Sequence, residues 1–271
     1  IGALTIVGDA FGKPMVKALD ARPGHWDLSS LMLVASSGVM WSEPVKEAML
    51  AHNPGMFLVD TFSSSEAIGM GSSISAGENA EKTAHFALGP GCQVFGDDGK
   101  PVEAGSGERG RVAVPGRVPI AYYKDPEKSA ATFIEFEGVR YSMPGDYATV
   151  DADGTISLLG RGSVCINTGG EKVFPEEVEE ALKTDPSVAD AVVVGLPDDK
   201  FGEAITAVVE PAADASLDEG ALIARVKEHL AHYKAPKRVV SIDTIGRAPN
   251  GKVDYKRMKA YAADELGIPL D

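Results

Sequence analysis

Apolar, strand-like runs alternate with helix-like runs over the first eighty residues, and this alternation constrains the fold more than any other feature of the chain. The strand-like runs are LTIVGD, LSSLMLVASSG and GMFLVDTFSSSE, and between them GKPMVKALDA and a segment starting near Ser42 read as helices. Such alternation predicts a parallel sheet, whose ligands lie beyond the carboxyl ends of the strands. Two loops of small residues, 36–38 and 63–66, stand at those ends, so we expect them to converge on one site.

The character of the sequence changes after Gly77. From there to Leu159, short extended pieces are separated by the turn-forming segments DDGK, GSGERG and DADG. Closely spaced turns between short strands are typical of antiparallel, barrel-like units. We therefore expect residues 1–161 to belong to one large domain, in which 1–76 is a parallel α/β piece and 77–161 is a β-barrel-like subdomain.

The sequence of residues 162–271 predicts a small α/β domain. The segment Gly160-Arg161-Gly162 before it reads as a hinge or linker. PEEVEEAL reads as a helix with proline in its first turn and acidic residues near the positive end of its dipole. ADAVVVGLPDD and EAITAVVEP read as strands joined by a turn, and KRVVSIDTI as a further strand. Ser216 and Glu219 form a capping-box pattern that opens a helix ending before Pro236. The expected fold class is therefore α/β and α+β.

The distribution of charge limits the class of partner. The chain has 26 Lys and Arg residues against 40 Asp and Glu, a formal net charge of −14, which argues against nucleic acid or an anionic membrane surface as the main partner. Residues 232–260 differ, because eight cations and two anions give this segment a balance of +6. A basic segment in an acidic protein suits a small polyphosphate ligand, although a solvated basic face is an ordinary alternative.

The cysteines and the apolar runs indicate a cytoplasmic protein. Cys92 and Cys165 are far apart and lack the spacing of a metal site or a disulfide framework, which fits a reducing compartment. No run approaches the length of a membrane span, and the N-terminal segment has no basic region or cleavage-site pattern. It also lacks an initiator Met, so we expect the chain to begin within a larger protein.

Lys252 lies in the segment APNGKVDYKR, where Asn250 and Gly251 favour a tight turn. Taken alone, a lysine in such a turn only keeps it solvated, as most lysines do. The rest of the sequence must supply any reason for a catalytic role.

Four separated segments supply such a reason. VDTFSSSEAIG, YSMPGDYATVDADGTISLLGRGSVCINTGGEKVFPEEVEEAL, VVVGLPDDKFGEAITAVV and APNGKVDYKRMK occur in one order along the chain. In this order and at these intervals the sequence resembles the adenylate-forming enzymes, specifically the acyl-CoA synthetases, and most of all the actinobacterial fatty-acid and steroid-acid CoA ligases. The resemblance covers nearly the whole chain and corresponds to the C-terminal half of such an enzyme.

This resemblance implies an AMP-forming acid–thiol ligase of lipid metabolism. A carboxylate attacks the α-phosphate of ATP to give an acyl-adenylate and pyrophosphate, and the CoA thiol then displaces AMP. The resemblance assigns Lys252 to adenylation, because it matches the lysine that reaches the carboxylate substrate and the α-phosphate together. It assigns Glu66 to holding Mg²⁺ between phosphate oxygens. ATP and CoA are thus implied as co-substrates and Mg²⁺ as the cofactor.

The resemblance also implies an adenine and phosphate site. Gly38 and Val39 align with the adenine loop, in which a bare backbone lets the base lie close. Phe62 takes the place of the usual tyrosine in FSSSE, and Ser63 that of the usual glycine; Ser65 keeps the hydroxyl expected near phosphate. A simple strand-to-helix turn is the alternative for the first of these segments.

Two more residues complete the nucleotide site that the resemblance implies. Asp146 matches the aspartate that accepts hydrogen bonds from the two ribose hydroxyls, and Arg161 is expected to reach ribose or phosphate. Met143 and Pro144 depart from the Thr-Gly-like pair that is more usual before this aspartate. Without the resemblance, an aspartate in a tight turn and a surface arginine are the ordinary interpretations.

The resemblance further implies a mobile small domain. Ser163 falls at the hinge position, where Asp or Lys is more common, and Gly169 and Gly170 match the loop that lines the pantetheine tunnel. Asn167 stands where many relatives have Lys. The small domain is expected to alternate between two poses, one for the Lys252 loop and one for the Gly169–Gly170 loop.

The phosphate loop of the family, an SSGTTGxPKG-like segment, does not occur in these residues. We therefore expect the isolated chain to bind nucleotide weakly and to have little adenylation activity. A carrier-protein adenylation domain and a noncatalytic nucleotide-binding module are the competing hypotheses. The sequence leaves open which acid is activated and whether the protein forms a homo-oligomer.

Overall fold

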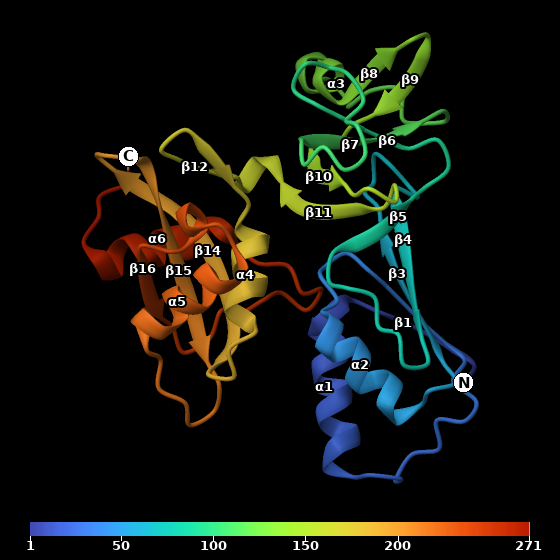
Figure 1. Cartoon of the computed structure of the whole chain (residues 1–271), viewed down its shortest axis with the longest axis vertical. Coiled ribbons are helices and arrows are strands. Elements are labelled where there is room, and N and C mark those ends of the chain that lie inside the picture. Colours follow the sequence, from blue (N-terminus) through green and yellow to red (C-terminus); the bar gives the residue numbers. More distant parts are fainter. Residues whose placement is uncertain (271) are drawn as a thin grey trace. The chain divides into compact units, whose positions relative to one another are not determined.

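The computed structural model describes residues 1–270, which divide into two compact units. Residues 1–159 with 249–251 form the first unit, and residues 160–248 with 252 onward form the second (Figure 1). Each unit has hydrophobic clusters of its own. The mixed α/β and α+β class expected from the sequence is confirmed.

The first unit begins with a parallel layer. Strands β1 (Ala3–Ile6), β2 (Leu33–Ser37) and β3 (Phe57–Phe62) pair in parallel, and helices α1 (Gly8–Ala21) and α2 (Glu43–His52) connect them. The two helices pack on each other (Figure 1). Apolar residues of the strands and of α2 form the core of the layer, with Trp41, Met49 and Leu58 almost completely buried. Burial of this apolar surface stabilises the layer and so fixes the strand ends that carry the loops.

An antiparallel region continues the same sheet. Strand β4 (Gly71–Ala76) pairs antiparallel with β3 and leads to β5 (His85–Leu88), which pairs with β4 and β11. The remaining strands are β6 (Gln93–Phe95), β7 (Arg109–Pro115), β8 (Phe133–Phe136), β9 (Val139–Ser142), β10 (Asp146–Val150) and β11 (Ile156–Arg161). They follow the order β5-β11-β10-β7-β9-β8, with β6 on β7, and α3 (Pro126–Thr132) precedes β8. The turn-rich segment of the sequence therefore forms antiparallel strands, as expected.

The second unit is built on a long hairpin. Strands β14 (Val188–Asp198) and β15 (Gly202–Pro211) pair antiparallel along almost their whole length. The other elements are β12 (Ile166–Thr168), β13 (Glu171–Val173), β16 (Arg238–Ser241), α4 (Pro175–Lys183), α5 (Glu219–His229), α6 (Tyr255–Leu266) and two 3-10 turns, Gly162–Val164 and His232–Lys234. The sheet has the order β13-β12-β15-β14, and β16 pairs in parallel with β15.

Side chains of the hairpin alternate between two cores, because successive residues of a strand point to opposite faces. Val193 belongs to the cluster that contains residues of α4 and α5, whereas its neighbours Val192 and Val194 belong to the cluster that contains residues of α6. This near-continuous burial explains why ADAVVVGLPDD has no simple polar alternation.

Two local expectations need correction, and one helix was not expected. Asp218, rather than Ser216, caps α5, since its Oδ1 accepts the amide of Ala221 at 3.0 Å. The strand expected over residues 237–245 is shorter and ends at Ser241. Helix α6, which no sequence pattern above singled out, begins after Asp254, whose Oδ1 accepts the amide of Arg257 at 3.0 Å.

Candidate functional site

The loops after β2 and β3 meet at one edge of the parallel layer. Ser37 pairs with Thr61 in the parallel register. The Ser37 hydroxyl donates to the Thr61 carbonyl at 2.9 Å, and the Thr61 hydroxyl donates to the Ser36 carbonyl at 2.9 Å. These reciprocal bonds hold the starts of both loops together, so the convergence expected from the sequence is observed.

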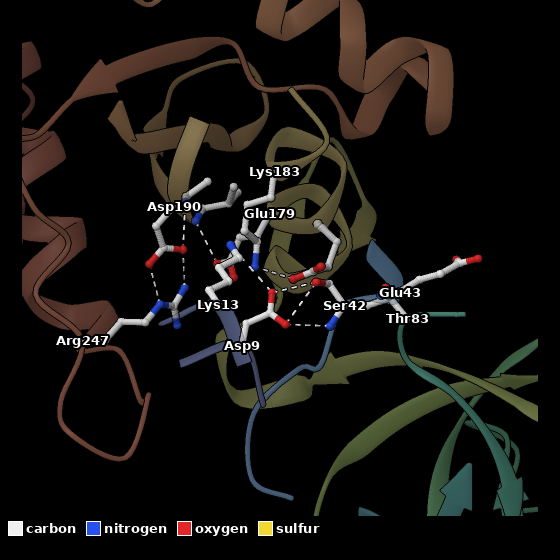
Figure 2. A network of polar contacts seen from close by, with 12 residues as sticks. Asp9, Lys13, Ser42, Glu43, Thr83, Glu179, Lys183, Asp190 and Arg247 are labelled. Carbon is white, nitrogen blue, oxygen red and sulfur yellow. Dashed lines mark hydrogen bonds and ion pairs between the residues drawn. The ribbon is translucent and has the colours of Figure 1, made fainter. Parts of the chain in front are cut away.

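The loop that contains Gly38 and Val39 is tied to the turn after β1. Gly38 has φ +97°, a conformation that favours glycine, and Val39 is partly exposed. The Ser42 amide donates to Asp9 Oδ1 at 2.8 Å, and its hydroxyl donates to Asp9 Oδ2 at 2.8 Å (Figure 2). A Cβ at Gly8 would lie 2.3 Å from the Met40 carbonyl oxygen. The adenine loop that we expect is therefore a braced backbone turn.

Phe62 and Ser65 differ in accessibility. Phe62 is 9% exposed and its ring packs against Phe86 with centroids 5.7 Å apart. The Phe62 side chain therefore has little accessible surface with which to contact a base. Ser65 is exposed, in a tight turn closed by a bond from the Ala67 amide to the Ser64 carbonyl at 3.2 Å.

Glu66 has a partner that sequence reasoning missed. The Tyr122 hydroxyl donates to Glu66 Oε1 at 2.6 Å, and the Lys128 ammonium lies 4.2 Å from the centre of the Tyr122 ring. This hydrogen bond is the main cause that lowers the pKa of Glu66, and the charge of Lys128 acts in the same direction. Burial and the neighbouring carboxylate raise the pKa of Tyr122. Glu66 is thus an ionised, oriented carboxylate.

An ionised carboxylate fits Mg²⁺, which binds through one or two carboxylates and completes its coordination with water and substrate phosphates. Among residues 1–270, no group of three or more His, Cys, Asp or Glu side chains is placed to hold a metal by itself. Glu66 is the carboxylate for which the sequence predicted a role in holding Mg²⁺. No helix in the same residues is long and apolar enough to cross a membrane.

Asp146 and Arg161 are terminal residues of two neighbouring strands, β10 and β11. Asp146 is the first residue of β10 and is 5% exposed. Arg161 is the last residue of β11 and its side chain is exposed. The Arg161 amide lies 3.5 Å from Glu176 Oε1, and a Cβ at Gly160 would lie 2.2 Å from the other oxygen of that carboxylate. The chain after Leu159 therefore passes close to α4 before it reaches Ser163, in the 3-10 turn Gly162–Val164.

Gly169 and Gly170 form the turn of a hairpin between β12 and β13. Their φ angles of +61° and +88° match those required by a two-residue turn of this kind. The Gly169 amide donates to the Phe201 carbonyl at 2.8 Å, and a Cβ at Gly169 would lie 3.3 Å from the Phe201 ring. Both glycines are exposed, as is Asn167. The result is a narrow, side-chain-free ridge.

Lys252 lies between β16 and α6 with its side chain exposed. The Ala248 amide donates to the Lys252 carbonyl at 2.9 Å and closes the turn. The predicted site residues thus divide between the two units: Gly38, Val39, Phe62, Ser65, Glu66 and Asp146 belong to the first, and Arg161, Ser163, Gly169, Gly170 and Lys252 belong to the second.

Comparison with known proteins identifies related sequences for the chain as a whole. Residues 177–252 match the AMP-binding enzyme C-terminal domain. The chain is 45% identical to 3-oxocholest-4-en-26-oate–CoA ligase of Rhodococcus rhodochrous, over 100% of this chain and 49% of the relative. It is 44% identical to a medium/long-chain-fatty-acid–CoA/3-oxocholest-4-en-26-oate–CoA ligase of Mycobacterium tuberculosis, over 98% and 49%. The chain therefore spans about half the length of the curated relatives it matches.

Solved structures show the same fold. ATP-bound MatB from Rhodopseudomonas palustris superposes with a TM-score of 0.80 at 24% identity, covering 97% of this chain and 51% of that chain. The amide bond synthetase McbA from Marinactinospora thermotolerans superposes with a TM-score of 0.79 at 26% identity, over 96% and 51%.

Proposed function

We propose that the chain is the C-terminal part of an ATP-dependent acyl-CoA ligase, because residues 177–252 match the AMP-binding enzyme C-terminal domain and the whole chain is similar to a CoA ligase. The observation that carries the proposal is the 45% identity to a named steroid-acid CoA ligase over 100% of this chain. The acid is a fatty acid or a steroid side-chain acid, the substrates that the names of the relatives state. The reaction takes place in the cytoplasm, where ATP and CoA are available.

The first half-reaction joins the acid to AMP. A carboxylate oxygen of the acid attacks the α-phosphorus, and the bond to pyrophosphate breaks with its electron pair leaving on pyrophosphate. Negative charge gathers around the α-phosphate, so a cation there lowers the barrier. The exposed ammonium of Lys252 supplies this charge and aligns the two reactants.

The residues of the first unit bind the nucleotide in this proposal. The braced turn at Gly38 and Val39 lies against adenine, with Phe62 beside it. Asp146 accepts from the ribose hydroxyls, Ser65 donates to phosphate, and Glu66, held by Tyr122, is the protein ligand for Mg²⁺. When bound, Mg²⁺ neutralises the charge of the phosphates.

The second half-reaction transfers the acyl group to sulfur. The CoA thiolate attacks the acyl carbonyl carbon, and the carbon–oxygen bond to AMP breaks with its electron pair leaving on AMP. The side-chain-free turn at Gly169 and Gly170 allows the narrow pantetheine arm to pass. We assign residues 1–161 to the large adenylation domain and 162–271 to the small mobile domain, with Ser163 at the hinge and Arg161 directed to ribose or phosphate.

A pyrophosphate-release assay on the native full-length protein tests the proposal. The assay contains ATP, Mg²⁺ and a panel of fatty and steroid acids, and compares wild type with Lys252→Ala. We expect acid-dependent release that falls about a hundredfold or more in the variant. Lys256→Ala, which removes an exposed lysine from the same segment, is the matched control and should retain activity.

Each outcome decides between hypotheses. Release followed by CoA thioester formation supports the ligase. Release followed by transfer only to a phosphopantetheinyl carrier protein supports a carrier-protein adenylation domain. AMP binding without release for any acid supports a noncatalytic nucleotide-binding module. The isolated 271-residue chain should show little release, and robust turnover by it would contradict that expectation.

A further inference from the structure

A buried carboxylate lies beneath the start of helix α6. Glu179 of α4 is 4% exposed, and its Oε1 accepts the Val193 amide at 3.0 Å and the Tyr255 hydroxyl at 3.1 Å. Tyr255 is the first residue of α6. One side chain therefore joins helix α4, strand β14 and the beginning of α6.

A second polar pair attaches the segment before Lys252 to strand β14. The Arg247 guanidinium donates to both oxygens of Asp190, with Nε–Oδ2 at 2.6 Å and Nη2–Oδ1 at 2.9 Å (Figure 2). Bidentate pairs of this type restrict orientation as well as distance. Asp190 and Val193 both belong to β14. The two anchors, Asp190–Arg247 and Glu179–Tyr255, are therefore both attached to strand β14.

These anchors stand on either side of Lys252 in the sequence. Arg247 precedes the turn that the Ala248 amide and the Lys252 carbonyl close, and Tyr255 follows it. Ile245 reinforces the first side, because it is fully buried and its amide donates to Glu210 Oε2 at 2.7 Å. Both ends of the Lys252 segment are thus attached to the hairpin sheet and α4.

Burying these polar groups costs free energy, so a gain in stability does not by itself explain the two anchors. A buried carboxylate and a partly buried ion pair lose hydration, and apolar residues of similar volume often stabilise a fold as well or better. Satisfied buried polar groups instead impose one geometry on the elements that they join. Here that geometry is the path of the backbone into and out of the turn at Lys252.

We propose that Glu179 with Tyr255, and Asp190 with Arg247, are positioning residues that set the placement of Lys252 and so support adenylation selectively. This proposal rests on the adenylation role proposed for Lys252. The four side chains act through the backbone and do not touch the reacting atoms. The Gly169–Gly170 turn lies between β12 and β13, and its Gly169 amide bonds to the Phe201 carbonyl at the far end of the hairpin, so we expect the second half-reaction to depend on the anchors much less.

The test measures the two half-reactions separately in the native full-length protein. Tyr255→Phe and Arg247→Ala should each slow acid-dependent pyrophosphate release about tenfold or more through kcat. CoA thioester formation from added acyl-adenylate should stay within twofold of wild type. Tyr261→Phe is the matched control, because this α6 tyrosine donates instead to the Ser241 carbonyl at 2.8 Å. Glu179→Gln keeps an accepting oxygen and should retain more adenylation than Glu179→Ala.

Equal loss of both half-reactions in Tyr255→Phe and Arg247→Ala, or no loss in either, overturns the proposal. A second measurement does not depend on the reaction: the hydrogen exchange of the Ala248 amide. Exchange should accelerate in Tyr255→Phe and Arg247→Ala while the Val192 and Val208 amides of the hairpin remain protected. If wild type releases no pyrophosphate, the function proposed for the chain fails. Independently of that result, unchanged hydrogen exchange at Ala248 in both variants would show that the anchors do not hold the Lys252 turn.

Discussion

The Tyr122 hydroxyl donates to Glu66 Oε1 across 2.6 Å, although the two residues are 56 positions apart in the chain. Tyr122 precedes α3, and Glu66 follows β3. The bond therefore links the parallel layer to the antiparallel region at the one carboxylate for which a metal role is proposed. It also lowers the pKa of Glu66, so the carboxylate is charged over a wider range of pH.

Tyr122→Phe tests this link. Loss of the hydroxyl removes the main cause of the lowered pKa, so the acidic limb of the pH–rate profile for pyrophosphate release should move to higher pH. The Mg²⁺ concentration needed for half-maximal rate should rise about threefold to tenfold, since the carboxylate loses its fixed orientation. Tyr123→Phe is the matched control, because the neighbouring side chain is 88% exposed. Identical profiles for the two variants would reject a role for the Tyr122 hydroxyl.

Gly169→Ala should separate the half-reactions in the opposite sense. The new Cβ strains a backbone at φ +61° and lies 3.3 Å from the Phe201 ring on the ridge proposed for pantetheine. Thioester formation from added acyl-adenylate should fall about tenfold or more while pyrophosphate release persists. Gly154→Ala is the control for strain, because Gly154 has φ +86° and nothing lies within 4 Å of its Cβ position. Loss of thioester formation in both variants would point to strain alone.

A double-mutant cycle on Asp190 and Arg247 should reveal a coupling free energy of about 1–3 kcal/mol in urea unfolding. The side chains are 20% and 27% exposed, so solvent screens the pair only in part. The pair Arg225–Glu228 on α5 is the control: its atoms lie 3.6 Å apart and its side chains are 36% and 65% exposed. We expect its coupling to be about 0.5 kcal/mol or less. Equal coupling in the two cycles would contradict a special role for the first.

The pH dependence of stability should report on Glu179. Burial raises the pKa of its carboxyl to about 7, against the opposing charges of Lys183 and Arg247. The folded state thus holds this proton more tightly than the unfolded state, so the free energy of unfolding should fall as pH rises from about 4.3 to 7 and then stay level. Glu179→Gln removes this titration, so its free energy of unfolding relative to that of wild type should rise by about 2.5 kcal/mol between pH 5 and pH 8.

Urea unfolding of both proteins at several pH values provides that measurement. The charged or titratable groups that act on Glu179 are Lys183 on the same helix, Tyr255 at the start of α6 and Arg247 in the segment before it. Glu176 acts in turn on Tyr255, and Asp190 acts on Lys183 and Arg247. Glu171→Gln, at an exposed position of β13, is the control and should follow wild type. A constant difference between Glu179→Gln and wild type at every pH would contradict the raised pKa.

The sequence predicted the parallel layer and the α4 start because each depends on short-range patterns. Strand-like runs alternating with helices determine which loops share a sheet edge, so the convergence of loops 36–38 and 63–66 could be inferred before any distance was known. Proline at the first position of α4 likewise marked a helix start. The position of Lys252 in a loop between a strand and the end of the chain was predicted as well.

The contacts that hold the site residues could not be predicted in the same way. Tyr122 reaches Glu66 because antiparallel strands bring distant segments together, and no periodicity encodes that meeting. Glu179 sits among the acidic residues of PEEVEEAL, where composition alone suggests a solvated face, yet its burial follows from the packing of α4 on β14. The strands flanking Gly169 and Gly170 have three residues each, too few for a period to show.

The long β14–β15 hairpin also bears on the order in which the second unit assembles. The two strands are joined by a short turn, at which Asp198 pairs with Gly202. Strand pairing that starts at this turn involves residues close in sequence, so it should form early. Strand β16 must wait for the crossover through α5, and Arg247 and Tyr255 find their partners only on a completed β14 and α4. Pulse-labelled hydrogen exchange should therefore protect Val192 before Ala248, and simultaneous protection would contradict this order. In such a sequence of events, the segment carrying Lys252 is the last part of its unit to take shape.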